Sequence, residues 1–149
     1  MATFANAAVQ TVATQQNVQF TDVISTSTNC QNSIIYTSGS GLVGLRGGKS
    51  CCCPAKYIVS YGANIAVPTG GTVGPISLAL SLNGEALAST QATVTPTVVE
   101  AFFNVSRTTE ITVPCGCCYQ LGVKNVVPTG GTAQDISVSN ASLTITRVA

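Results

Sequence analysis

The amino-acid sequence predicts an all-β fold, either a sandwich or a barrel of about eight to ten antiparallel strands. The clearest observation is the alternation of large apolar and small residues over 76–82, which is typical of a strand with one buried face. This segment ends at Asn83-Gly84, a dipeptide favoured in two-residue hairpin turns. No stretch of the chain combines helical spacing of apolar residues with helix caps, so helices are not predicted.

Alternation and turn residues place the other strands. We expect strands over residues 15–21, 33–36, 42–46, 56–67, 76–82, 85–90, 98–105, 110–113, 119–126 and 135–148. In the last segment the apolar residues change parity between Val138 and Leu143, which predicts a β-bulge near Asn140. Residues 15–149 are expected to form a single domain, and residues 1–14 an N-terminal arm or a first strand.

A short motif occurs twice, as Val67–Thr72 and as Val127–Thr132, and each copy leads into an Ile-Ser pair. A phosphate-binding glycine loop is one interpretation, but no lysine follows the glycines and no helix is predicted to begin there. The motif is therefore expected to be a turn used twice. Proline fixes one φ angle, and the glycine pair is expected to take the positive-φ positions.

Charged residues form only 7% of the chain, against about 25% in an average soluble domain. Either the surface is polar and uncharged or much of it is covered by subunit contacts, and we favour subunit contacts. The six basic residues are scattered, so neither nucleic-acid binding nor electrostatic docking to a membrane is expected. The uncharged run 57–84 contains prolines and glycines and alternates like strands, so it is not a predicted membrane span.

The residues that usually perform catalysis are scarce. Histidine is absent, which excludes Ser-His-Asp and Cys-His catalysis and histidine-based metal sites. The five carboxylates are not paired in the sequence, and aromatic residues are too few for a typical sugar-cleaving site. The carboxylates are Asp22, Glu85, Glu100, Glu110 and Asp135. We predict that the protein is not an enzyme and has no catalytic residue, cofactor or metal.

Seven cysteines are the most distinctive feature. They are the lone Cys30, the run Cys51, Cys52 and Cys53, and the cluster Cys115, Cys117 and Cys118. A structural zinc site needs two Cys-x-x-Cys pairs, which the run at 51–53 does not supply, and no base for a redox role is evident. We favour one or two disulfides that link the two clusters within a chain or between neighbouring subunits. In a reducing compartment all seven would stay thiols.

Four segments carry a resemblance to a known family. They are Gly41–Gly47, Ala55–Asn64, Ile76–Gly84 and the closing Asn140–Ala149. Together they resemble the C1q/TNF-like jelly-roll domain of phage structural proteins and of the head of collagen-like glycoproteins on bacterial spores. The chain lacks the Gly-X-Y stalk of the spore proteins and adds the cysteine clusters.

The resemblance implies a ten-stranded jelly roll that forms a homotrimer, with apolar and aromatic residues along its axis. It suggests six residues as core or trimer-interface positions. These are Tyr57, Val59, Tyr61, Phe102, Phe103 and Tyr119.

The sequence therefore predicts a non-enzymatic structural protein that assembles with itself. The expected setting is a phage virion surface, where the chain is a capsid decoration or fibre module that contacts a capsid or other particle protein. The N-terminus has no secretory signal pattern, which fits a protein released by lysis. The alternatives are a spore- or cell-surface filament subunit cross-linked through cysteines, and a module that binds a glycan or a host receptor.

Overall fold

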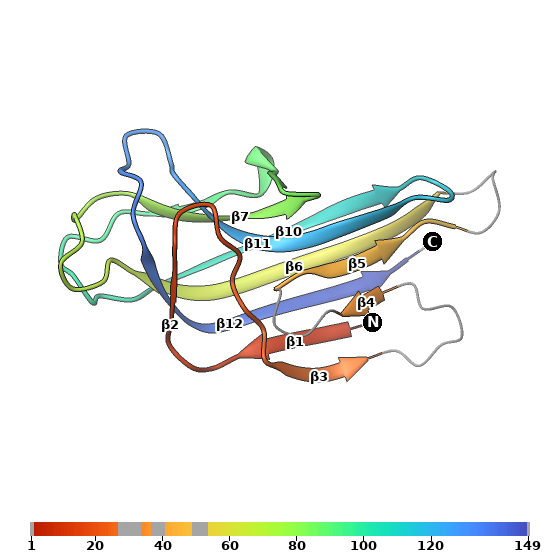
Figure 1. Ribbon diagram of the computed structural model, residues 1–149, viewed down its shortest axis with the longest axis horizontal. Coiled ribbons are helices and arrows are strands. Elements are labelled where there is room, and N and C mark those ends of the chain that lie inside the picture. Colours follow the sequence, from red (N-terminus) through yellow and green to blue (C-terminus); the bar gives the residue numbers. More distant parts are fainter. Residues whose placement is uncertain (1, 27–33, 37–40, 49–53, 149) are drawn as a thin grey trace.

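The computed structural model describes residues 2–26, 34–36, 41–48 and 54–148 and shows an elongated two-layer sandwich (Figure 1). In these residues the chain forms twelve strands and one 3-10 helix, η1 (Ala88–Thr90). The strands are β1 (Ala2–Asn6), β2 (Gln10–Val12), β3 (Asp22–Thr26), β4 (Ile34–Tyr36), β5 (Val43–Arg46), β6 (Ala55–Ala66), β7 (Ile76–Leu82), β8 (Glu85–Ala86), β9 (Ala92–Val94), β10 (Phe103–Val113), β11 (Cys118–Val126) and β12 (Ile136–Arg147). The all-β prediction is confirmed.

The strands form two antiparallel sheets. Sheet A has the order β10-β6-β12-β1-β3, and β2 also pairs with β12. Sheet B has the order β4-β5-β11-β7-β8, and β9 also pairs with β7. The chain crosses between the sheets from β3 to β4, from β5 to β6, from β6 to β7, from β9 to β10, and on either side of β11, which is jelly-roll topology.

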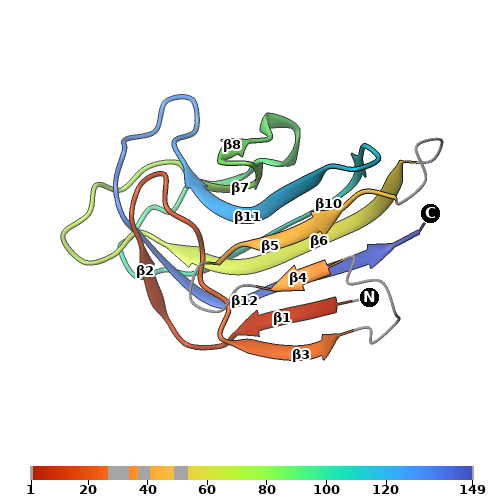
Figure 2. The same cartoon turned by 45° about the vertical axis from the view of Figure 1, so that its right-hand side comes forward.

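The first and last strands, β1 and β12, pair with each other in the middle of sheet A. Ala2 pairs with Ile145 and Asn6 with Ala141, so β1 lies against β12 along its whole length. The other side of β1 pairs with β3. The segment expected to be an arm or a first strand thus contains two strands, β1 and β2. As a result, the start of β1 and the end of β12 lie at the same end of the sandwich (Figures 1 and 2).

The core lies between the sheets. Alternate residues of β6 point inward, and Tyr57, Val59 and Tyr61 are at most 2% exposed. The predicted strand over 76–82 is β7, whose Leu78 and Leu80 are fully buried. Burial of such side chains is the main favourable term in folding, at roughly 25 cal/mol per Å² of apolar surface.

Two predicted local features are confirmed. Asn83 and Gly84 both have positive φ and join β7 to β8 through the pair Leu82–Glu85, as expected for a two-residue hairpin. The pairing of β12 with β6 shifts register at Asn140, which has φ +50°. This bulge explains how the apolar residues of β12 can change parity and still face the core.

The repeated motif forms the same turn twice, as predicted. The Gly71 amide donates to Pro68 O and the Gly131 amide to Pro128 O, both at 2.9 Å. The φ prediction was wrong in one respect, because only the first glycine of each pair, Gly70 or Gly130, has positive φ. One positive-φ residue, in the third position, is sufficient for a type II turn.

The two copies of the motif also lie next to each other. The Gln134 side chain accepts a hydrogen bond from the Thr72 amide at 2.9 Å and donates one to Thr72 O at 2.8 Å. This contact fastens the first motif to the segment that follows the second.

Four of the predicted strand segments differ from the structure. Residues 15–21 contain only an isolated bridge at Asn17, although Val18 and Phe20 are buried as the alternation implied. The 85–90 segment becomes the short β8 followed by η1. The segments 98–105 and 110–113 are parts of one continuous strand, β10, whose polar middle lies on a sheet edge and therefore shows no apolar alternation.

No helix in the described part of the chain is long and apolar enough to cross a bilayer.

Candidate functional site

The centre of the outward face of sheet A is made of short, uncharged side chains. One row crosses four strands from Thr3 to Thr144, Ser60 and Thr108, each residue pairing with the next. The adjacent row is made in the same way. It runs through Ala5, Ser142, Gly62 and Ser106. All eight residues are exposed or half-buried, so nothing in the described chain covers the centre of this face.

Hydrogen bonds along the sheet satisfy some of these polar groups. The Thr108 hydroxyl donates to Ser60 Oγ at 3.0 Å, and Asn104 Nδ2 donates to Asn64 Oδ1 at 3.2 Å. Such lateral contacts lower the cost of removing the groups from water, because partly paired polar atoms lose fewer hydrogen bonds to water.

Charge appears towards one end of the face and at its β3 edge, where the exposed Asp22 pairs with Ala5. Lys56 Nζ lies 3.6 Å from Glu110 Oε1, and both side chains are about half exposed. An exposed pair of this kind contributes little to stability, at roughly 0–1 kcal/mol. Beside Glu110 in the ladder is Ile58, whose side chain is 42% exposed. At the other end, directly before β10, Phe102 is 38% exposed.

The residues suggested by the resemblance separate into two groups. Tyr57, Val59 and Tyr61 are core residues of the single chain, and Tyr119 packs partly buried against the same core. Phe102 and Phe103 are exposed, Phe103 at 44%. Burial is the largest influence on the Tyr61 hydroxyl and raises its pKa to about 12, although Arg107 opposes the shift.

The centre of the outward face of sheet A was not identified from the sequence. Serine, threonine and glycine at alternate strand positions look like an ordinary solvent-facing side. The available signal was the absence of lysine and glutamate from those positions in 58–64 and 140–146.

The second cysteine cluster lies in the turn between β10 and β11. Gly116 has φ +75°, and the Cys117 amide donates to Pro114 O at 3.1 Å. Cys117 and Cys118 are exposed thiols, and Cys115 is half-buried. Cys30 and Cys51–Cys53 lie outside the described residues, so the predicted link between the clusters stays a prediction.

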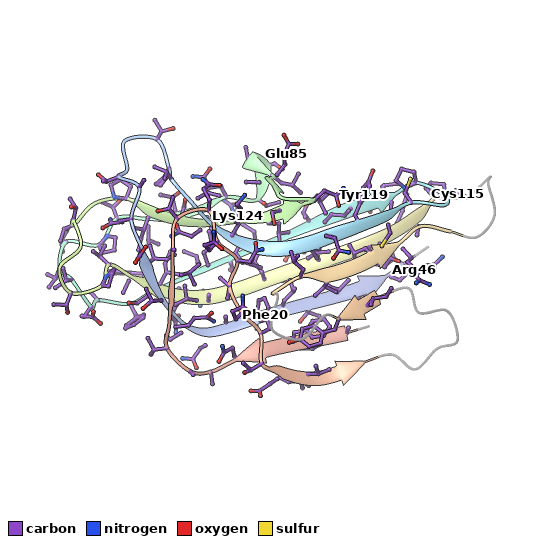
Figure 3. All side chains as sticks on the ribbon, in the orientation of Figure 1. Phe20, Arg46, Glu85, Cys115, Tyr119 and Lys124 are labelled. Carbon is purple, nitrogen blue, oxygen red and sulfur yellow. The ribbon has the colours of Figure 1, made fainter. Side chains whose placement is uncertain are left out.

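Backbone hydrogen bonds join this turn to the residues that follow β5. The Gly47 amide donates to Cys117 O at 2.8 Å, and the Gly116 amide donates to Gly48 O at 3.3 Å. A Cβ atom on Gly47 would lie 1.9 Å from Pro114 O, so only glycine fits there. Figure 3 shows Cys115 and Arg46 at this same end of the sandwich.

Metal-binding geometry is not found in the described part of the chain. Cys115 and Cys118 do have the Cys-x-x-Cys spacing. However, no three cysteine, aspartate or glutamate side chains among the described residues are placed to share a metal ion.

At the opposite end, the loops are fastened together and expose apolar side chains. Glu100 Oε1 accepts hydrogen bonds from the Thr69 amide at 2.8 Å and from its hydroxyl at 3.2 Å. Val73, Val98 and Phe103 are 44%, 61% and 44% exposed in or beside these loops. This end of the sandwich, called the loop end below, therefore has loops joined by hydrogen bonds and a partly apolar surface.

Comparison with known proteins finds similarity in the fold, and none in the sequence at the level of a family model or a curated relative. No protein-family model matches the sequence, and no curated protein matches it. Among solved structures, the Eiger TNF of S. frugiperda superposes with a TM-score of 0.71 and 15% identity, covering 99% of this chain and 91% of that one. The globular domain of zebrafish complement 1qA gives a TM-score of 0.66 and 12% identity, covering 99% and 96%. The chain therefore has the C1q/TNF-like jelly-roll fold.

Proposed function

We propose that this chain is a non-enzymatic structural subunit that assembles with itself as a homotrimer through the outward face of sheet A. The observation that carries the proposal is the absence of charge across the centre of that face, where β10, β6, β12 and β1 present only Ser, Thr, Gly and Ala in two adjacent rows.

The chemistry of this face suits burial against another protein. Interface cores are depleted in charged residues, because each buried charge loses hydration that it rarely regains. Short side chains lose little conformational entropy on contact and allow close approach of the two backbones. Ile58 and Phe102, each about 40% exposed, supply apolar area at the two ends. The number of subunits comes from the resemblance to C1q/TNF-like proteins.

The direct test introduces a charge at the centre of the face. Ser142 is exposed on β12, so Ser142→Arg is expected to leave the single chain folded but to lower the mass in light scattering from three chains to one. The matched control is Thr93→Arg, an exposed threonine in β9 of sheet B, which should keep the trimer. A Ser142→Arg protein that stays trimeric, or a wild-type protein that is monomeric, refutes this interface.

The setting that we propose is the surface of a phage virion, with a spore or cell surface as the alternative. The support is the scarcity of charged residues together with the family resemblance. Mass spectrometry of purified virions from a lysate, after protease treatment of the intact particles, tests this directly. Detection of the chain in the particles, with loss on protease treatment, supports the proposal, whereas its absence from them contradicts it.

A glycan- or receptor-binding role is a second candidate, favoured by the loop end. There Phe102 and Phe103 are 38% and 44% exposed, and exposed aromatic rings can hold sugars by stacking. A glycan array is the test. Binding that Phe103→Ala abolishes supports the role, and an array without hits counts against it for glycans.

A further inference from the structure

We propose that one water molecule is bound inside each chain, between the side chains of Asn17 and Ser81 on the outer side of sheet B. Ser81 of β7 pairs with Gly122 of β11, and Asn17 forms a bridge with Lys124, two residues further along β11. Ser81 follows the core residue Leu80, so its side chain points away from the core. The site lies on the layer that does not carry the proposed trimer face, so the inference is independent of the trimer.

The first observation is a pair of buried oxygen atoms without partners. Asn17 Oδ1 and Ser81 Oγ are both shielded from solvent, and neither has a hydrogen-bond partner among the described residues. Ser81 as a whole is only 1% exposed. Nearly all buried polar atoms in folded proteins are hydrogen-bonded, because a buried group without a partner loses its bonds to water and gains none in return. These two atoms therefore need a partner that the described side chains do not supply.

The second observation is that both oxygens border the same space, above the Cα atom of Gly122. A Cβ atom built on Gly122 would lie 2.9 Å from Asn17 Oδ1 and 3.2 Å from Ser81 Oγ. Carbon atoms rarely come so close to oxygen, whereas hydrogen-bonded oxygen atoms lie about 2.7–2.8 Å apart. Because glycine has no side chain, this space is lined by two polar atoms that a small hydrogen-bonding molecule can reach together.

Neighbouring residues close the space and hold its walls in place. Leu42 Cδ2 would lie 3.2 Å from the same Cβ position, so an apolar side chain forms a third wall. The backbone next to Asn17 is fixed to β11, since the Val18 amide donates to Val123 O at 2.7 Å. Asn17 therefore cannot reach solvent by a movement of its main chain alone, and its oxygen stays beside Gly122.

Water is the ligand whose chemistry fits these two atoms. The Asn17 amide oxygen only accepts hydrogen bonds, whereas the Ser81 hydroxyl can donate or accept. A water molecule donates to the first and forms a hydrogen bond of either sense with the second. Two to four polar partners are usual for a buried water, and this site supplies two.

Other partners fit less well. Hard metal ions take roughly six or more oxygen ligands, and no three cysteine, aspartate or glutamate side chains in the described part of the chain are placed to share an ion. The Lys124 ammonium is close along the chain, but it donates to Gly84 O at 2.7 Å and to neither of the two oxygens. The bound water then links the segment between β2 and β3 to β7, across β11.

The first experiment is a crystal structure of the full chain at a resolution that shows ordered water. It should show one water within hydrogen-bonding distance of both Asn17 Oδ1 and Ser81 Oγ. Gly122→Ala should lose this water, because its methyl group takes the space. The variant is expected to fold, since the atom nearest to the new Cβ is the end of the Asn17 side chain, which can move aside.

The second measurement counts long-lived internal waters in solution by oxygen-17 relaxation dispersion. Gly122→Ala should lower the count by one water per chain. Gly44→Ala is the matched control in sheet B, because its Cβ would meet its nearest atom at 3.4 Å, an ordinary contact, and the count should not change. Ser81→Ala removes only a hydroxyl and should also lose the water, since one hydrogen bond is too few to hold it.

Three results would overturn the inference. They are a wild-type crystal structure without a water between the two oxygens, a direct hydrogen bond from the Ser81 hydroxyl to Asn17 Oδ1, and a water count that neither Gly122→Ala nor Ser81→Ala lowers. The trimer is measured separately by light scattering, so its failure and the failure of this site are distinguishable.

Discussion

The hydroxyl of Tyr61, on β6 of sheet A, lies 3.0 Å from the main-chain oxygen of Leu78, on β7 of sheet B. It also lies 2.7 Å from Thr90 O, so a single side chain spans the core and binds two segments of the opposite layer. Tyr57, four residues earlier on the same strand, donates in the same way to Arg46 O of β5. The two sheets are therefore joined by directional contacts as well as by apolar packing.

Replacing Tyr61 with phenylalanine should destabilise the fold without changing it. The variant keeps the ring but leaves Leu78 O and Thr90 O without this donor, and a buried polar group without a partner costs about 1–3 kcal/mol. Urea unfolding should show a lower midpoint with an unchanged slope. Tyr119→Phe is the control, because no hydrogen bond of its hydroxyl is found within the described residues, and it should shift the midpoint much less.

Stability should fall at high pH because of Tyr61. Its pKa is about 12 in the folded protein, mainly because burial disfavours the charged form, and about 10 when unfolded. Between these values the unfolded chain releases the proton and the folded chain keeps it, so stability present below pH 10 is lost as the pH rises towards 12. Urea midpoints between pH 8 and pH 11.5 measure the loss, which should be smaller in Tyr61→Phe. If wild type and Tyr61→Phe lose the same stability over this pH range, the loss comes from groups other than Tyr61.

Gly47→Ala should disrupt the end that carries Cys117. The new Cβ would lie 1.9 Å from Pro114 O, and a backbone atom can move away only if the β10–β11 turn shifts. We expect a loss of about 3 kcal/mol or more, the range of strongly disruptive substitutions. Gly74→Ala is the matched control, since its Cβ would meet nothing within 4 Å. Thermal unfolding of both variants makes the comparison, and similar melting temperatures would contradict the close contact.

Gln134→Ala should loosen the loop end selectively. It removes both hydrogen bonds to Thr72, so hydrogen exchange at that amide should accelerate, with a stability loss of about 1–2 kcal/mol. Gln120→Ala, at an exposed position on β11, should leave the exchange at Thr72 unchanged. If Gln134→Ala also leaves exchange at Thr72 unchanged, the two repeated turns are not held together by this side chain.

Sequence patterns predicted the features that depend on neighbouring residues. The alternation over 76–82 predicted β7 because a strand exposes successive side chains to opposite faces. The Asn83-Gly84 hairpin and the Asn140 bulge were predictable because backbone conformation there follows from a few adjacent residues. The edge strand β10 was divided wrongly, since its polar middle carries no apolar period.

The sequence by itself thus determined the strand content, the turns and the scarcity of charge. Only the tertiary structure decided that Ser60, Thr144 and Thr108 form one row on a single face, and that Gly47 lies against Pro114. The physical reason is that both relations depend on the register between strands distant in the chain. Register is set by the packing of the whole core, and the sequence of one strand does not specify its partner.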